Sequence, residues 1–397
     1  MKILKKVVSA PNKKEGFGIP FLFGKNKSIF AFFSTKIEPY IENKLVVFDL
    51  DLNIKVEHPY NSNLFHGNVI IENNLVYHNY ENHEIDSLSF NGNSTLYKLP
   101  NDNYTGNIII DSEKLIIQKS LGDNCEYELL EFKSGIRIWN KKFDRIVLYG
   151  NLFTKDYNVG LLQGAKHSEI QCFNFRTGDL LWSHEVQDWF VFNSVSGNVI
   201  KNQVRQLVIY KHLVIANMHG HLIAFDLDTG KEAWRTNIGL MYLHTQYFFI
   251  LDEIEGTLWV NTSTTNYNNG TLKCINADSG IVLFSAPKTW DNNWQQIYPL
   301  AIANPNINYG DVWLPHFSMN KNFLFYSFQG GFIGVMDKKT GVIVEWFRFT
   351  KKGGFVNQGH KLLNKTLYQA TEFELLAVDV SEYFIDGDEY EKNAKDD

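Results

Sequence analysis

The residues with the greatest chemical potential are aromatic side chains mixed with amides in one long segment. Residues 286–318 contain Trp290, Trp294, Tyr298, Trp313 and His316, with Asn and Gln between them. Rigid aromatic rings beside adaptable amides are typical of surfaces that recognise protein or carbohydrate. The segment therefore predicts a binding loop. The alternative is a surface loop whose rings only cover the edge of the fold.

A second set of candidate binding residues shares a spacing. Each lies fourteen residues after a glycine that recurs along the chain, and the set is Tyr149, Phe192, His244, Trp294 and Phe355. If the register of the repeat holds, we expect these residues to converge at one opening. The alternative is that they pack among the inner strands.

The sequence assigns no residue a catalytic role. Acidic pairs such as Asp252 and Glu253 have no partner that would make one residue an acid and the other a base. His219 and His221 flank Gly220, but histidines in turns are commonly exposed, and we predict no metal site. The sequence has neither a Gly-rich phosphate loop before a helix nor a Gly-x-Ser-x-Gly elbow. We therefore expect no catalytic residue and no cofactor.

Composition and charge limit the class of protein. The 397 residues are 44% hydrophobic and 15% aromatic, with a formal net charge of −6. Because this charge does not resemble a nucleic-acid footprint, we expect no nucleic-acid partner. Lysines interrupt the N-terminal stretch, and no run approaches the roughly 18 apolar residues of a membrane span. We therefore expect no membrane partner. The three cysteines, Cys125, Cys172 and Cys274, are far apart, which predicts buried thiols in a reducing cytoplasm.

The elements that must position the candidate residues are short strands in a repeat. One pattern reads LIAFDLDTGKEAW at 222–234 and recurs at 129–139, 170–182, 272–284 and 332–346, with a degenerate copy at 45–56. Its turn glycines are Gly92, Gly135, Gly178, Gly230, Gly280 and Gly341. Each unit holds about four strands in roughly 50 residues, which is the signature of a β-propeller blade. We therefore predict an all-β fold, a propeller of four-stranded antiparallel blades.

The turn and the aromatic residue after it have predicted structural roles. Glycine supplies the positive φ of the hairpin between the third and fourth strands. In the copy at 45–56, Asn53 stands at the glycine position and is expected to take this conformation. Trp139, Trp182, Trp234 and Phe284 each follow a turn glycine by four residues. We expect these rings to dock between neighbouring blades.

The ends of the chain are expected to close the ring. The final unit, at 361–380, lacks an outer strand, which residues 3–9 can supply. This arrangement removes an exposed sheet edge and gives eight blades; seven remains open if the terminal strands complete a unit already counted. Residues 1–380 are then one propeller domain. Residues 381–397 are an acidic tail, expected to be partly disordered, with Tyr383 and Phe384 anchoring its start.

The repeat at 213–234, LVIANMHGHLIAFDLDTGKEAW, resembles the pyrroloquinoline-quinone (PQQ) type of propeller repeat. The parts that match are Gly220, Phe225, Asp226, Thr229, Gly230, Lys231 and Trp234. The resemblance extends over about two thirds of the chain and is specific for fold. The family includes exported quinone dehydrogenases, which hold their cofactor with Ca²⁺, and non-enzymatic scaffolds. This chain has neither adjacent cysteines nor an export signal, so the resemblance favours the non-enzymatic branch.

The sequence therefore predicts a non-catalytic binding protein, above all a scaffold for a protein partner. A dedicated partner, such as the toxin bound by a bacterial immunity protein, fits this description. The alternative is an enzyme or a small-ligand binder, with an axial pocket for a glycan or a quinone.

Overall fold

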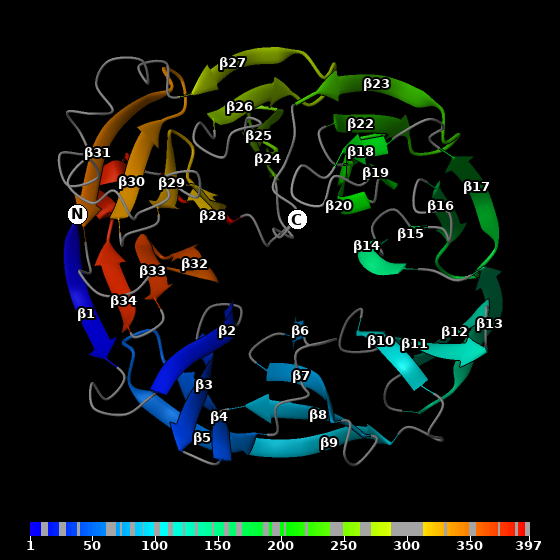
Figure 1. Ribbon diagram of the computed structural model, residues 1–397, viewed down its shortest axis with the longest axis horizontal. Helices are drawn as coiled ribbons and strands as arrows, with labels where there is room; N and C mark the ends of the chain where they lie inside the picture. Colours follow the sequence, from blue (N-terminus) through cyan, green and yellow to red (C-terminus); the bar gives the residue numbers. More distant parts are fainter. Residues whose placement is uncertain are drawn as a thin grey trace.

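Antiparallel sheets arranged as blades around a common axis make up the computed structural model (Figure 1). The described residues are 1–8, 15–23, 29–37, 40–60, 69–71, 74–79, 84–89, 91–98, 104–109, 114–121, 124–131, 134–144, 147–154, 159–163, 169–185, 190–192, 199–201, 204–218, 221–238, 249–262, 271–286, 313–328, 332–348, 355–371, 374–385 and 388–393. Within these residues, eight sheets each contain four neighbouring blade strands, which confirms the propeller and the prediction of eight blades.

The first four blades follow in chain order, from the innermost to the outermost strand. Blade 1 is β2 (Glu15–Phe23), β3 (Ile29–Ile37), β4 (Tyr40–Phe48) and β5 (Ile54–Tyr60). Blade 2 is β6 (Val69–Ile71), β7 (Asn74–Asn79), β8 (Glu84–Ser89) and β9 (Gly92–Lys98). Blade 3 is β10 (Tyr104–Ile109), β11 (Lys114–Leu121), β12 (Asn124–Glu131) and β13 (Arg137–Asp144). Blade 4 is β14 (Val147–Thr154), β15 (Val159–Gln163), β16 (Glu169–Asn174) and β17 (Leu180–Glu185).

A separate hairpin precedes the other four blades. It pairs β18 (Phe190–Phe192) with β19 (Val199–Lys201). Blade 5 is β20 (Val204–Tyr210), β21 (Leu213–Met218), β22 (His221–Asp226) and β23 (Glu232–Asn237). Blade 6 is β24 (Phe249–Asp252), β25 (Thr257–Thr262), β26 (Thr271–Asn276) and β27 (Val282–Ala286). Blade 7 is β28 (Trp313–Met319), β29 (Phe323–Phe328), β30 (Phe332–Asp337) and β31 (Val342–Arg348).

Blade 8 joins the two ends of the chain. It contains β32 (Phe355–Leu363), β33 (Thr366–Thr371) and β34 (Glu374–Asp379), with β1 (Lys2–Val8) as the outermost strand. Strand β1 pairs antiparallel with β34, from Lys2 opposite Asp379 to Val8 opposite Glu374. The predicted closure by N- and C-terminal strands is therefore present (Figure 1).

The tail after blade 8 also has described structure. A 3₁₀ turn, η2 (Ser381–Tyr383), follows β34, and the short strand β35 (Lys392–Asn393) pairs with the inner edge of β28. Tyr383 and Phe384 are buried beside blades 7 and 8. None of the described helices is long and apolar enough to cross a membrane.

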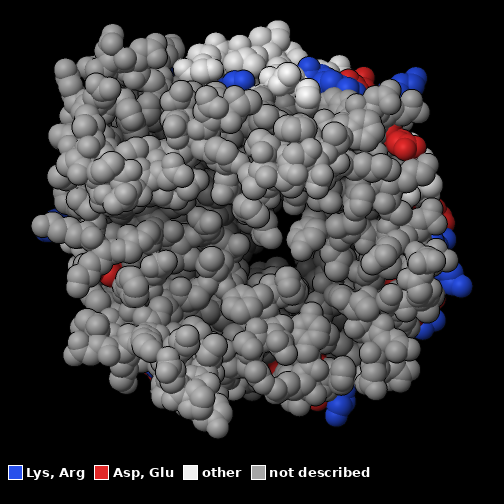
Figure 2. Space-filling model, in the orientation of Figure 1, with Lys and Arg blue, Asp and Glu red and all other residues white. Residues whose placement is uncertain are grey.

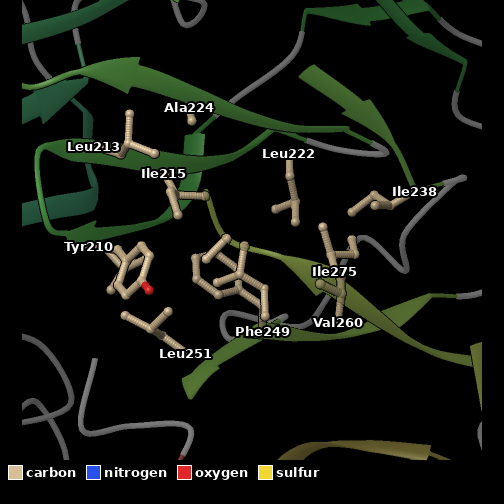
Figure 3. Packing of buried hydrophobic residues seen from close by; sticks show 13 residues of the cluster. Tyr210, Leu213, Ile215, Leu222, Ala224, Ile238, Phe249, Leu251, Val260 and Ile275 are labelled. Carbon is tan, nitrogen blue, oxygen red and sulfur yellow. The ribbon is translucent and has the colours of Figure 1, made fainter. Parts of the chain in front are cut away.

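The hydrophobic core lies between the faces of adjacent blades. Side chains alternate across a strand, so each blade presents apolar residues to both neighbours. Figure 3 shows the cluster between blades 5 and 6, where Leu213, Ile215 and Leu222 of one blade pack near Phe249 and Val260 of the other. Comparable clusters join blades 4 and 5, 6 and 7, 7 and 8, and 8 and 1.

Five of the six predicted turn glycines lie between the third and fourth strands with the expected conformation, whereas Gly92 is the first residue of β9, opposite Ser89. Gly135, Gly178, Gly230, Gly280 and Gly341 have φ between 66° and 71°. In blade 5, Asp226 Oδ1 accepts hydrogen bonds from the Thr229 backbone N–H at 2.9 Å and the Thr229 hydroxyl at 2.7 Å. This acidic residue therefore fixes its own turn, as expected for Asp at such a position.

The prediction for Asn53 is wrong. The left-handed residue of blade 1 is Leu52, with φ 56°. Leu52 N–H bonds to the Asp49 carbonyl, whereas Gly230 N–H reaches four residues back to Asp226. The shorter turn moves the positive φ one position earlier. Asn53 instead donates its backbone N–H to Asp49 Oδ1 at 2.8 Å.

Tryptophan rings join successive blades, as predicted. The indole Nε1 of Trp139, Trp182 and Trp234 donates to the carbonyl of Phe175, Leu227 and Ala277, at 2.9, 2.7 and 3.1 Å. Each acceptor lies in the glycine turn of the next blade. These rings therefore fix the position of a neighbouring blade.

The contact between blades 6 and 7 uses different chemistry. Blade 6 has Phe284 at the tryptophan position, and a phenyl ring has no N–H to donate. Here Asp252, at the end of β24, forms a 2.5 Å ion pair with Lys338 in the glycine turn of blade 7. The two side chains are 0% and 6% exposed. Lys338 Nζ also donates to the carbonyls of Asn320 and Lys321, at 2.9 and 2.8 Å.

Candidate functional site

The candidate site is the end of the ring at which the innermost strands begin. Neighbouring strands within a blade are antiparallel, and the blades repeat in one orientation around the axis (Figure 1). The innermost strands therefore all begin at the same end of the ring. Loops at such an end are where a propeller scaffold carries binding residues.

Four predicted site residues lie in innermost strands, three of them near this end. Tyr149 is the third residue of β14, Trp313 and His316 are the first and fourth of β28, and Phe355 is the first of β32. The structure describes their backbone and not their side chains. Tyr149, Trp313 and Phe355, from blades 4, 7 and 8, are thus at or near the beginning of their strands, whereas His316 is in the middle of β28.

Phe192 occupies a different kind of position. It is the last residue of β18 and lies opposite Val199 of the separate hairpin. The innermost strand of blade 5 begins later, at Val204. The equal spacing therefore does not place Phe192 in an innermost strand, because a hairpin is inserted in the connection from blade 4. His244, Trp290, Trp294 and Tyr298 lie outside the described residues.

Two amides near this end were not singled out in the sequence. Gln206, near the start of β20, donates Nε2–H to the Phe249 carbonyl at 3.0 Å and accepts the Phe249 N–H at 3.2 Å. It thereby joins the innermost strands of blades 5 and 6. Asn217, opposite Gln206 in the ladder, is 0% exposed, and neither side-chain polar atom has a hydrogen-bond partner among the described residues. The feature of the sequence that could have identified both residues is an amide within an otherwise apolar strand.

The face seen in Figure 2 shows charged side chains of the described residues near its circumference, with both signs present. An exposed ion pair between Lys211 of blade 5 and Asp278 of blade 6, at 2.9 Å, joins two adjacent blades. Among the described residues, no group of three or more His, Cys, Asp and Glu side chains could hold a metal ion.

His360 is a buried base in the innermost strand of blade 8. Its Nδ1 lies 2.8 Å from Gln369 Oε1, and the side chain is buried. Burial disfavours the imidazolium and lowers the pKa of His360 to about 4, against an opposing effect of its hydrogen bonds to Gln369 and Phe325. The ring is therefore neutral at physiological pH.

This burial predicts acid sensitivity of the fold. Between about pH 6.5 and 4 the unfolded chain binds a proton at His360 that the folded chain does not, so stability falls as pH falls through this window. The expected loss at pH 4 is about 3 kcal/mol from this residue. Urea unfolding at pH 7 and pH 4.5 checks it in the natural protein and in His360→Gln, which cannot titrate. An equal pH dependence in both proteins would remove His360 as its source.

Cys172 and Cys274 are buried free thiols. Burial, followed by the charge of Asp228, raises the pKa of Cys172 to about 12. Burial likewise raises the pKa of Cys274 to about 11. A thiol reagent at pH 8 should therefore label at most one cysteine in the native protein and all three after denaturation. Rapid labelling of two sites in the native state would contradict this burial.

Comparison with known proteins supports the fold and leaves the family open. No protein-family model matches the chain, and no curated protein matches it. Among solved structures, BamB from Moraxella catarrhalis is 12% identical over 94% of this chain and 98% of its own, with a TM-score of 0.57. A europium-containing methanol dehydrogenase is 10% identical over 93% of this chain and 84% of its own, with a TM-score of 0.53.

A third structure was solved with a protein partner. Sqt1 from Chaetomium thermophilum, bound to the N-terminus of ribosomal protein L10, is 10% identical over 89% of this chain and 93% of its own, with a TM-score of 0.54. These similarities show the β-propeller fold. BamB and the methanol dehydrogenase have propellers of the PQQ-repeat type, the type that the sequence at 213–234 resembles.

Proposed function

We propose that this protein is a non-catalytic scaffold of the PQQ-repeat type that binds a protein partner at the end of the ring where the innermost strands begin. The observation that supports this proposal is that Tyr149, Trp313 and Phe355 lie at or near the first residue of the innermost strands of three blades, with His316 further along β28. Aromatic residues are enriched at the centres of protein interfaces, where they contribute most of the binding energy.

The third similar structure supports the kind of partner. Sqt1 shares the fold and was solved with the N-terminus of another protein bound. A fold alone does not determine function, so the proposal for this chain depends on its own residues. Those residues are large aromatic side chains with a histidine, which are suited to recognition.

Affinity capture from the extract of the native cell tests the proposal. We expect one stoichiometric protein partner with the natural chain and at least about tenfold weaker capture with Tyr149→Ala/Phe355→Ala. Lys231→Ala, at an exposed position near the rim of blade 5, is the matched control and should retain the partner. Thermal stabilisation by a quinone with Ca²⁺ or by a sugar, without a captured protein, would favour the ligand-binding alternative instead.

A further inference from the structure

The axial edge of blade 7 carries an additional strand. Lys392 and Asn393 of β35 lie opposite Met319 and Ser318 at the end of β28. Among the described innermost strands, β28 alone has a strand on its axial side. Figure 1 shows β28 at the inner end of its blade. The ladder with β35 is two residues long, whereas β28 continues through Trp313–Phe317 without a described axial partner.

An acidic side chain precedes this strand and is bound by a turn of blade 8. Asn364 and Lys365 connect β32 to β33 with φ of 50° and 59°. Their backbone N–H groups donate to the two carboxylate oxygens of Glu391, at 2.9 and 2.6 Å. Successive N–H groups in such a turn form a concave site for an anion. The contact therefore selects a carboxylate at this position.

The neighbouring side chains add two further contacts. Tyr390 packs against the apolar cluster between blades 6 and 7, which includes Met319. Lys392 Nζ lies 3.3 Å from a Glu253 carboxylate oxygen in the first hairpin of blade 6. Three consecutive side chains thus contact three blades. The Tyr390 ring contacts blades 6 and 7, the Glu391 carboxylate contacts blade 8, and the Lys392 ammonium contacts blade 6.

We propose that the axial edge of β28, the Asn364–Lys365 turn and Glu253 form a docking site for an extended acidic peptide with a Tyr-Glu-Lys core, which the chain's own segment Asp388–Asn393 occupies in cis. Strand addition supplies the affinity and the flanking side chains supply the specificity, as in other edge-binding interactions. A partner that carries a similar segment would have to displace this one. The apparent affinity for such a partner is reduced by the fraction of molecules whose site is open.

A peptide with the sequence of residues 386–397 tests the proposal without any unknown partner. Its binding to the full chain is measured by fluorescence anisotropy in three proteins. The natural protein and Glu389→Gln, which changes an exposed side chain, should bind it at least about tenfold more weakly than Tyr390→Ala/Glu391→Gln. Hydrogen exchange at residues 388–393 and 318–319 should be faster only in the double variant.

Three results would overturn the proposal. One is a peptide that binds the double variant no better than the natural protein. Another is unchanged hydrogen exchange in that variant, which would mean that Tyr390 and Glu391 do not hold the segment. The third is a natural protein that is dimeric by light scattering and becomes monomeric in the double variant, which would assign the segment to a second copy. Because no external partner is used, these results are independent of the proposed function.

Discussion

Replacing Asp252 by alanine is expected to destabilise the protein by about 3–5 kcal/mol, because it leaves the Lys338 ammonium buried without its counter-charge. The pair lies at 2.5 Å between blades 6 and 7 and is nearly inaccessible to solvent. Blade 6 has Phe284 where blades 3, 4 and 5 have a tryptophan, so no indole hydrogen bond from that position offsets the loss. Urea unfolding at pH 7 measures the effect.

A matched pair elsewhere in the ring controls for charge removal. Lys211 and Asp278 also join adjacent blades, at 2.9 Å, but their side chains are 54% and 48% exposed. Asp278→Ala should therefore cost about 1 kcal/mol or less. Asp252→Leu/Lys338→Met, which removes both charges, should recover most of the stability lost in Asp252→Ala. Equal effects of Asp252→Ala and Asp278→Ala would contradict the buried pair.

Gly230→Ala is expected to cost about 3 kcal/mol, from backbone strain and a steric clash together. Gly230 has φ 68°, a conformation that an alanine adopts at a cost. A methyl group on Gly230 would also lie 2.6 Å from ring atoms of Trp182, from the preceding blade. Thermal and urea unfolding of the variant measure the combined effect.

A double-mutant cycle separates these two causes. In a Trp182→Ala background the ring is gone, so Gly230→Ala should cost only the backbone part, about 1–2 kcal/mol. Lys231→Ala, at the next position and exposed, should change stability by less than about 0.5 kcal/mol. A Gly230→Ala cost that is the same with and without the Trp182 ring would show that the ring does not require glycine there.

The blades could be predicted from the sequence because the residues that form each turn also form the contact between neighbouring blades. The turn between the third and fourth strands needs a positive φ, which glycine supplies at Gly135 and Gly178. The rings of Trp139 and Trp182 each bind the glycine turn of the next blade. Because these requirements recur in every regular unit, they appear in the sequence as a repeat. The closure by β1 was also predictable, because an unpaired outer strand leaves an exposed edge.

Other features depend on contacts that no repeat encodes. The positive φ at Leu52 results from a turn one residue shorter than those of later blades. Phe192 lies in a hairpin that interrupts the equal spacing. The ion pair of Asp252 and Lys338 joins residues of two blades, and β35 pairs with a strand far away in the sequence. Single-sequence spacing carries no information about such long-range partners.

The proposed binding face has a rival in the exposed rim of the ring. Leu180 and Leu181, in the outermost strand of blade 4, are 55% and 51% exposed. Exposed aliphatic side chains on an outer strand are an alternative contact surface for a protein. Loss of binding in an alanine variant does not by itself say which surface touches the partner.

Site-specific photo-crosslinking distinguishes the two surfaces most directly. A photoreactive phenylalanine analogue is introduced singly at Tyr149, Trp313, Phe355 or Leu181, and each protein is irradiated with the captured partner. The proposed function predicts crosslinks from the three innermost-strand positions and none from Leu181. Crosslinks from Leu181 alone would contradict it and place the partner on the rim.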